Sequence, residues 1–107
     1  MGERKEKVAS VLKKIASSFI QKNSINGVLV TVTKVTVSDD LKNSTVFINV
    51  FPEDREKKTL EDLKKMEKEL RWYAKSHLSM KFLPSFEFEI DCGTKNEQRI
   101  NELLGKV

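Results

Sequence analysis

The chain of 107 residues is 38% hydrophobic and 34% charged, with a net charge of +4 and a pI of about 9.2. This length and composition fit one soluble domain, residues 1–107, with flexible ends at 1–4 and 105–107, and they exclude a disordered chain. A single cysteine excludes an intramolecular disulfide, and no apolar run reaches the roughly 20 residues of a membrane helix, so we expect a cytoplasmic protein.

The first half of the chain predicts one helix followed by two strands. Apolar residues recur at helical spacing from Arg4 to about Lys22, which predicts an amphipathic helix with one buried face. Residues 28–38 are rich in Val and Thr and predict a strand, whose apolar phase slips at Lys34. This slip indicates either a β-bulge or burial on both faces. Residues 45–51 predict a second strand that forms a hairpin with the first.

The second half predicts a long helix, or two helices that meet at a kink, then a strand and a short C-terminal helix. We expect Thr59 to cap the long helix and Pro84 to stop it. Residues 86–91 alternate Phe and Ile with Glu and Asp, which predicts a strand with one buried and one acidic face. The expected buried side of the long helix comprises Leu60, Leu63, Met66, Leu70, Tyr73, Ala74, His77 and Leu78, and that of the C-terminal helix comprises Ile100, Leu103 and Leu104.

This order of elements predicts an α+β fold with a three-stranded sheet and helices packed on one face. The connection from the second strand through the long helix to the third must cross the sheet. We expect a right-handed crossover that places the third strand beside the first and parallel to it.

The outer side of the long helix is the candidate for nucleic-acid binding. On a helical wheel four basic residues fall beside the buried stripe, and the exposed Trp72 could stack on a base or an RNA sugar. No acidic residue occurs from Arg71 to Leu83; residues 1–82 hold 17 basic and 11 acidic side chains, whereas residues 83–107 hold 3 and 5. A merely solvated charged face is the alternative interpretation. The four basic residues are Lys64, Lys68, Arg71 and Lys75.

The sequence offers no catalytic constellation. His77 falls on the apolar side of the helix, which favours a packed or half-buried residue over a catalyst, and Cys92 is expected to be a small packing residue. One His and one Cys do not provide a metal ligand set, so we expect neither a metal nor a cofactor. The acidic spacing of Glu87, Glu89 and Asp91 is that of an outward strand face. A small hydrolase that uses Cys92 or His77 is the least favoured hypothesis.

Three stretches resemble the ribosome-binding factor A family: VTVTKVTVSDDLKNSTVFINV (30–50), LRWYAKSHLSMKFLPSFEFEID (70–91) and NEQRINELL (96–104). The resemblance implies a KH-like fold of the type II order, helix-strand-strand-helix-helix-strand. The GxxG loop of RNA-clamping KH domains cannot be carried over, because no glycine lies between Gly27 and Gly93. The kink that the family has between its two helices falls on Met66-Glu67-Lys68.

The resemblance also implies a non-catalytic assembly factor that binds the free 30S subunit late in its maturation. Such a factor acts on the 5′ region of the 16S rRNA and matters most in the cold. We expect a monomer without a membrane or small-molecule partner; the alternative is a protein-interaction module that uses Trp72. The expected RNA-binding residues are Lys64, Lys68, Arg71, Trp72, Lys75 and Lys81, with an arm of Arg4 and Lys5.

Overall fold

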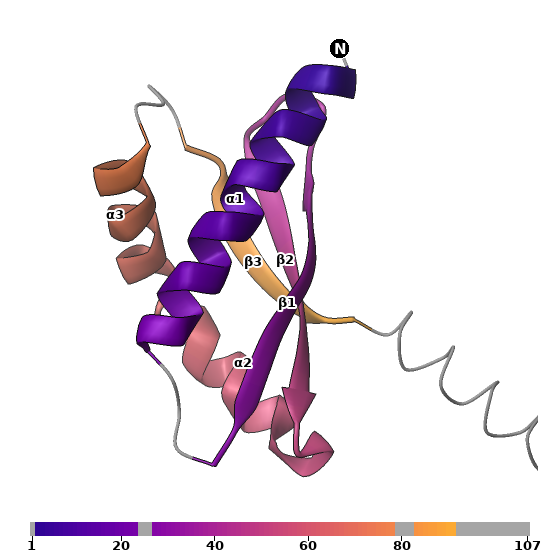
Figure 1. Ribbon diagram of the computed structural model, residues 1–107, viewed down its shortest axis with the longest axis vertical. Coiled ribbons are helices and arrows are strands. Elements are labelled where there is room, and N and C mark those ends of the chain that lie inside the picture. The colour runs from indigo at the N-terminus through magenta and orange to yellow at the C-terminus, as the bar shows by residue number, and fades with distance from the viewer. Residues whose placement is uncertain (1, 24–26, 79–82, 92–107) are drawn as a thin grey trace, which may run out of the picture.

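The computed structural model describes residues 2–23, 27–78 and 83–91, which form three helices, a 3-10 turn and three strands (Figure 1). The predicted C-terminal helix and Cys92 lie outside the described residues. None of the helices in the described part of the chain is long and apolar enough to span a membrane. In chain order the elements are α1 (Gly2–Lys22), β1 (Leu29–Val37), β2 (Asn43–Phe51), the 3-10 turn (Glu53–Arg55), α2 (Glu56–Lys65), α3 (Glu67–His77) and β3 (Ser85–Ile90).

The sheet has the order β1-β2-β3, with β1 antiparallel to β2 and β3 parallel to β2. The hairpin of the first two strands is therefore confirmed, but the expected place of β3 beside β1 is wrong. Strands that are consecutive in the chain usually lie side by side, and β2 has a free edge opposite β1, which β3 occupies after α2 and α3 have crossed back over the sheet. The chain thus returns to the start of β2 before β3 begins, and β3 runs in the direction of its neighbour.

The slip in the apolar alternation of β1, predicted at Lys34, is a β-bulge in the structure. The register with β2 shifts between Val32 and Lys34, so Thr33 is the extra residue. Its hydroxyl Oγ1 lies 2.6 Å from Oδ2 of Asp91, to which it donates. Asp91, expected on the exposed acidic face of β3, is instead buried just beyond the end of that strand. The bulge supplies the polar partner that makes this burial possible.

The helices pack on one face of the sheet, and the core lies between the two layers (Figure 1). The inward positions of the strands alternate as expected, and β3 buries Phe86 and Phe88. The fully buried Leu12 of α1 and Leu70 of α3 meet this apolar layer. Glu87 and Glu89 of β3 are exposed on the opposite face, which no described helix covers.

The long helix is divided in two, as the kink hypothesis expected, and the break lies at Met66 (φ −91°, ψ 5°). Two predicted boundaries are wrong. Thr59 does not cap the helix: α2 begins at Glu56, directly after the 3-10 turn, and Thr59 is buried within it. The helix also ends at His77, well before Pro84, because Leu78 already adopts an extended conformation.

Candidate nucleic-acid interface

The outer face of α3 brings together four of the expected RNA-binding residues. Lys68, Arg71 and Lys75 lie within about 60° of one another around the helix axis, at about 100° per residue. All three are exposed, and the neighbouring Trp72 is 75% exposed. On the inner side of the helix Leu70 and Ala74 are fully buried, as expected. Packing of the inner stripe therefore fixes which side chains of α3 face solvent.

Lys64 is separated from this group by the break at Met66. It belongs to α2 and is exposed beside β3, where it lines a groove together with Leu60 and Glu67. The continuous four-residue ridge that a single helix would give is thus divided into three cations on α3 and one on α2.

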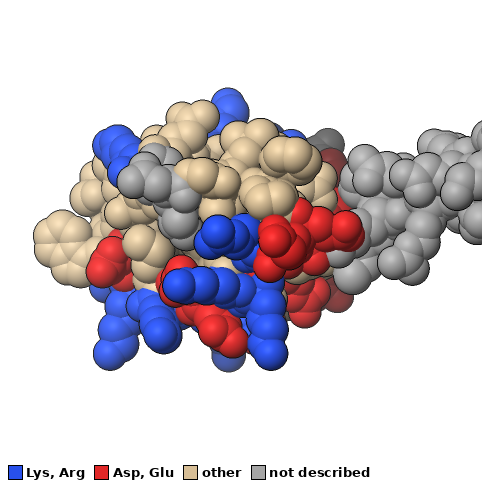
Figure 2. All heavy atoms as spheres, turned by 90° about the horizontal axis from the view of Figure 1, so that it is seen from below, with Lys and Arg blue, Asp and Glu red and all other residues tan. Residues whose placement is uncertain are grey.

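The first turn of α3 carries the acidic residues nearest to this face. Glu67 Oε1 lies 3.9 Å from Arg71 Nε, one helical turn away, and Glu69 is exposed. Glu67 is half-buried but Arg71 is exposed, and a pair at this distance contributes little to stability, so Arg71 can exchange Glu67 for another anion. From the end of the molecule that carries α2, Lys and Arg side chains gather along the lower border of the view with acidic side chains among them (Figure 2).

The remaining predicted contacts do not join the α3 face. Arg4 and Lys5 lie in the first turns of α1 rather than in an arm, and Lys5 Nζ is 2.8 Å from Oδ1 of Asp39. The contact between α1 and α3 is near Ser18, about 21 Å further along the α1 axis than Arg4. Lys81 lies outside the described residues.

Tyr73 joins α3 to α1. Its hydroxyl lies 2.7 Å from Ser18 Oγ, its ring centroid is 5.7 Å from that of Phe19, and Lys22 Nζ is 4.9 Å from the ring. The hydrogen bond with Ser18 lowers the pKa of the Tyr73 phenol from its ordinary value, partial desolvation opposes this shift, and Lys22 acts in the same direction as Ser18. These contacts fix α3 against α1 and thereby orient its outer face.

His77, expected to be packed or half-buried, is exposed. It is the last residue of α3, where the helix extends beyond the core that covers Leu70 and Ala74. Its Nδ1 lies 2.9 Å from the Tyr73 carbonyl oxygen, and its ring packs 4.3 Å from the Tyr73 ring. No three His, Cys, Asp or Glu side chains are grouped for metal binding within 2–23, 27–78 and 83–91. His77 thus contacts the last turn of its own helix.

The sequence interpretation missed a second basic surface on α1. Lys7, Lys13, Lys14 and Lys22 are all exposed, and the chain has no acidic residue between Glu6 and Asp39. Lys13 and Lys14 border a shallow depression together with serines of the same helix. This acid-free run is a signal in the sequence that could have identified the α1 surface. It is longer than the run from Arg71 to Leu83, which indicated the surface of α3.

Comparison with known sequences identifies relatives over nearly the whole chain. The model of the family described as ribosome-binding factor A matches residues 4–104. Ribosome-binding factor A of Protochlamydia amoebophila is 32% identical over 109 residues, which cover 98% of this chain and 83% of the relative. The protein of that name from Macrococcus caseolyticus is 34% identical over 110 residues, covering 96% of each chain.

Solved structures agree with this assignment. The crystal structure of ribosome-binding factor A from Thermus thermophilus matches with a TM-score of 0.73 and 28% identity, covering 80% of this chain and 93% of the other. A solution structure of a putative ribosome-binding factor A from Thermotoga maritima gives a TM-score of 0.67 and 25% identity, covering 80% and 85%. These matches confirm the expected KH-like α+β fold. The chain belongs to the ribosome-binding factor A family.

Proposed function

We propose that this protein is a ribosome-assembly factor that binds the free 30S subunit and acts by occupancy, without catalysis. The outer face of α3 carries the proposal: it presents Lys68, Arg71 and Lys75 beside the exposed Trp72. Support comes from a relative, since a homology model of Thermus thermophilus ribosome-binding factor A has been fitted into a cryo-EM map of a 30S complex. That model matches this chain with a TM-score of 0.66 and 26% identity, covering 76% of this chain and 88% of the relative.

The basic residues of this face suit the RNA backbone. Phosphate contacts position a protein on RNA without reading its sequence, so specificity would come from rRNA shape. With Lys64 of α2 added, four phosphate contacts would give a salt slope of about −3 on logarithmic axes. Trp72 would stack on an unpaired base or a sugar, and the α1 lysines would extend the footprint in the same molecule.

The finer parts of the proposal concern the target and the timing. We place the action on the 5′ region of the 16S rRNA, late in maturation, in the cytoplasm and with the largest need in the cold. The protein would act as a monomer. Depletion of the protein should therefore leave unprocessed 16S 5′ ends, measured by primer extension, and this excess should grow as the growth temperature falls. Equal processing with and without the protein at low temperature would contradict this part.

Cosedimentation with purified subunits tests the binding itself. We expect salt-sensitive association with 30S, weaker association with 50S and 70S, and loss of binding in a Lys68→Glu, Arg71→Glu, Lys75→Glu variant. A matched control carries Lys42→Glu, Lys57→Glu and Lys58→Glu, three exposed positions away from α3 with the same change in charge. Equal loss in both variants would show that net charge, and not the α3 face, governs binding. No association of the wild-type chain with 30S would contradict the proposed function.

The exposure of Trp72 also favours a second candidate function, a protein-interaction module in which this ring is the central contact. This candidate predicts binding to 30S particles that survives nuclease treatment and responds weakly to salt. Nuclease-sensitive binding with a steep salt slope would exclude it.

A further inference from the structure

The outer edge of β3 has backbone hydrogen-bonding groups that the sheet does not use. β3 is the last strand in the described sheet, with β2 on one side only. The amide of Asp91 donates to the carbonyl oxygen of Ile48 in β2, and the amide of Ser85 donates to that of Lys42, the residue just before β2. Alternate residues of a strand direct their backbone groups to opposite sides. The N–H and C=O groups of Phe86, Phe88 and Ile90 therefore point away from β2.

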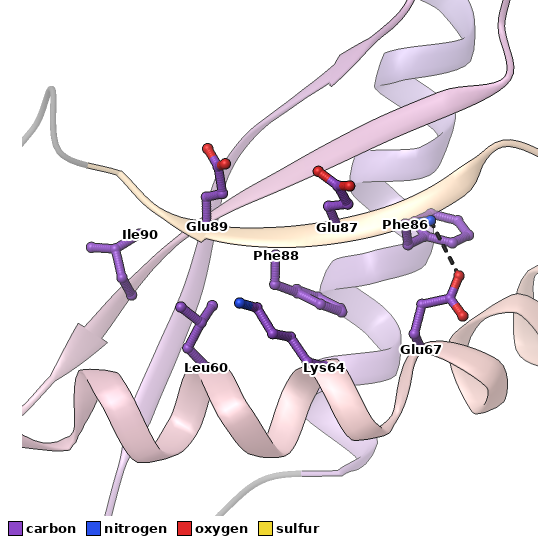
Figure 3. A pocket seen from close by; sticks show the side chains of 8 residues that line it. All are labelled: Leu60, Lys64, Glu67, Phe86, Glu87, Phe88, Glu89 and Ile90. Carbon is purple, nitrogen blue, oxygen red and sulfur yellow. Dashed lines mark hydrogen bonds between the residues drawn. The ribbon is translucent and has the colours of Figure 1, made fainter.

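The amide of Phe86 is one of the three that point away from β2, and it has a partner on that side. Phe86 N–H donates to Oε1 of Glu67 at 3.3 Å, across the space between β3 and the helices (Figure 3). The described residues provide no such partner for the amides of Phe88 and Ile90. Proteins commonly cover or charge an open strand edge, because it is a template for pairing with another strand. Here the Glu67 side chain covers only the first part of the edge.

The edge opens onto a groove between β3 and α2. Leu60 and Lys64 line its helical side, and the strand from Phe86 to Ile90 lines the other. The close-up shows Phe88 turned toward α2, whereas Glu87 and Glu89 point to the opposite side of the strand (Figure 3). A strand added at this edge would alternate in the same way. One set of its side chains would meet Leu60 and Ile90, and the other set would lie beside Glu87 and Glu89.

The charged side chains beside the groove indicate which class of molecule could bind at the edge of β3. Glu87 and Glu89 are exposed, and neither forms an ion pair with another described residue. Opposite charges on neighbouring strands stabilise a pairing, and like charges oppose it. On the side of β3 away from the helices, the two carboxylates therefore favour Lys and Arg side chains of an added strand and disfavour phosphates, whereas Lys64 is the cation on the helical side of the groove. The segment between the helices, at Met66, also has no glycine that would let a phosphate backbone approach closely.

We propose that the outer edge of β3 binds an extended segment of a partner protein by strand addition, with apolar side chains toward Leu60 and Ile90 and basic side chains toward Glu87 and Glu89. The partner is thus a protein with a segment in which apolar residues alternate with Lys or Arg. Backbone hydrogen bonds supply affinity and the alternate side chains supply specificity, as in other cases of strand addition. Lys64 lines this groove and is also one of the proposed phosphate contacts, but the groove does not include Lys68, Arg71 and Lys75 of the α3 face. The proposal does not depend on RNA binding by that face.

Titration of the full chain with a defined peptide, followed by amide NMR shifts, tests the proposal. The probe is a hexapeptide of alternating Val and Arg, and the matched control replaces each Arg by Glu. We expect saturable shifts centred on the amides of Phe88 and Ile90 with the basic peptide, and weaker binding of the acidic one. Shifts centred elsewhere would overturn the proposal. A single-stranded RNA hexamer that binds this edge more tightly than the peptide would likewise overturn it and assign the groove to RNA.

Two variants separate the contributions of backbone and charge. Ile90→Pro removes an outward amide but leaves the odd-numbered residues paired with β2, and proline is tolerated at such edge positions. Loss of one hydrogen bond should weaken peptide binding about tenfold. Glu87→Lys with Glu89→Lys, which keeps the backbone intact, should reverse the preference toward the acidic peptide. An unchanged preference in this folded variant would contradict the proposal even if Ile90→Pro failed to fold.

Measuring both peptide binding and 30S binding of these variants separates the test of the β3 edge from the test of the proposed function. The β3 variants should keep their binding to 30S, whereas the Lys68→Glu, Arg71→Glu, Lys75→Glu variant should keep its binding to the peptide. Loss of peptide binding in this α3 variant would overturn the assignment to β3, and failure of wild-type 30S binding alone would leave the peptide result standing.

Discussion

The outer face of α3 and the outer edge of β3 lie next to each other in the fold and carry opposite charge. α3 presents Lys68, Arg71 and Lys75, whereas β3 presents Glu87 and Glu89. Both surfaces rest on the same core. Residues three or four apart share a face in a helix, and residues two apart share a face in a strand. Each segment therefore separates its charged from its apolar side chains, and one small domain acquires two surfaces suited to different partners.

The largest predicted effect would break both surfaces at once. Leu70→Ala removes a fully buried side chain behind the α3 face, and we expect the free energy of unfolding to fall by about 2–5 kcal/mol. Urea denaturation followed by circular dichroism measures the change. Glu69→Ala, at the neighbouring exposed position, is the control. A loss below about 1 kcal/mol for Leu70→Ala would contradict the shared core.

A smaller effect on the free energy of unfolding distinguishes the buried acid at the end of β3 from the exposed acids of that strand. Asp91 is buried and accepts a hydrogen bond from Thr33, so Asp91→Ala should reduce the free energy of unfolding by about 1–3 kcal/mol. Glu89→Ala changes an exposed residue and should stay within about 0.5 kcal/mol. The same denaturation assay compares the two variants. Equal effects would mean that Asp91 behaves as a surface acid after all.

A third prediction concerns binding rather than stability. Trp72→Ala should weaken 30S binding about tenfold, the cost of one lost stacking contact, and leave the free energy of unfolding within about 0.5 kcal/mol. Phe51, 71% exposed at the far end of β2, is the matched aromatic control, and Phe51→Ala should not change 30S binding. Cosedimentation at constant salt measures both variants. Equal weakening would show that the α3 face is not the site.

The smallest effect is expected in the turn between β1 and β2. The Asp40 carboxylate accepts hydrogen bonds from the Ser38 hydroxyl and the Lys42 amide, which lower its pKa from the usual 3.8. A pKa lowered by folding stabilises the protein above the unfolded value, and this contribution is lost as the pH falls through the folded value. Asp40→Asn should therefore cost a little stability at neutral pH and almost none in strong acid. Denaturation across a pH series measures the difference, and a constant difference would contradict it.

Much of the fold could be predicted because each element carries its own periodicity. The helix α1, the slip at Lys34 and the alternation from Phe86 to Ile90 were predicted correctly. Within the apolar stripe predicted for α1, Val11 is exposed. The errors lie where a neighbouring element decides. Thr59 has the chemistry of a cap but lies inside α2, and His77 has the spacing of a core residue but extends beyond the core.

The candidate RNA-binding site was predicted in part for the same reason. Lys68, Arg71, Trp72 and Lys75 share one uninterrupted helix, so the wheel placed them together correctly. Lys64 lies in α2, before the break at Met66, and a single helical wheel cannot be extended across this break. The α1 lysines lie in an acid-free run of the sequence, but only the tertiary structure shows that Lys22 of this run contacts Tyr73 of α3.

The sequence by itself determined which residues are apolar and at what period, and hence the elements, the buried faces and the family. The tertiary structure alone decided how these elements meet. It placed β3 beside β2, divided the long helix at Met66, buried Asp91 against the bulge at Thr33 and left the outer edge of β3 facing a groove. The physical reason is that periodicity is a local property of the chain. Strand order, burial of a polar group and an open edge depend on contacts between residues far apart in the sequence.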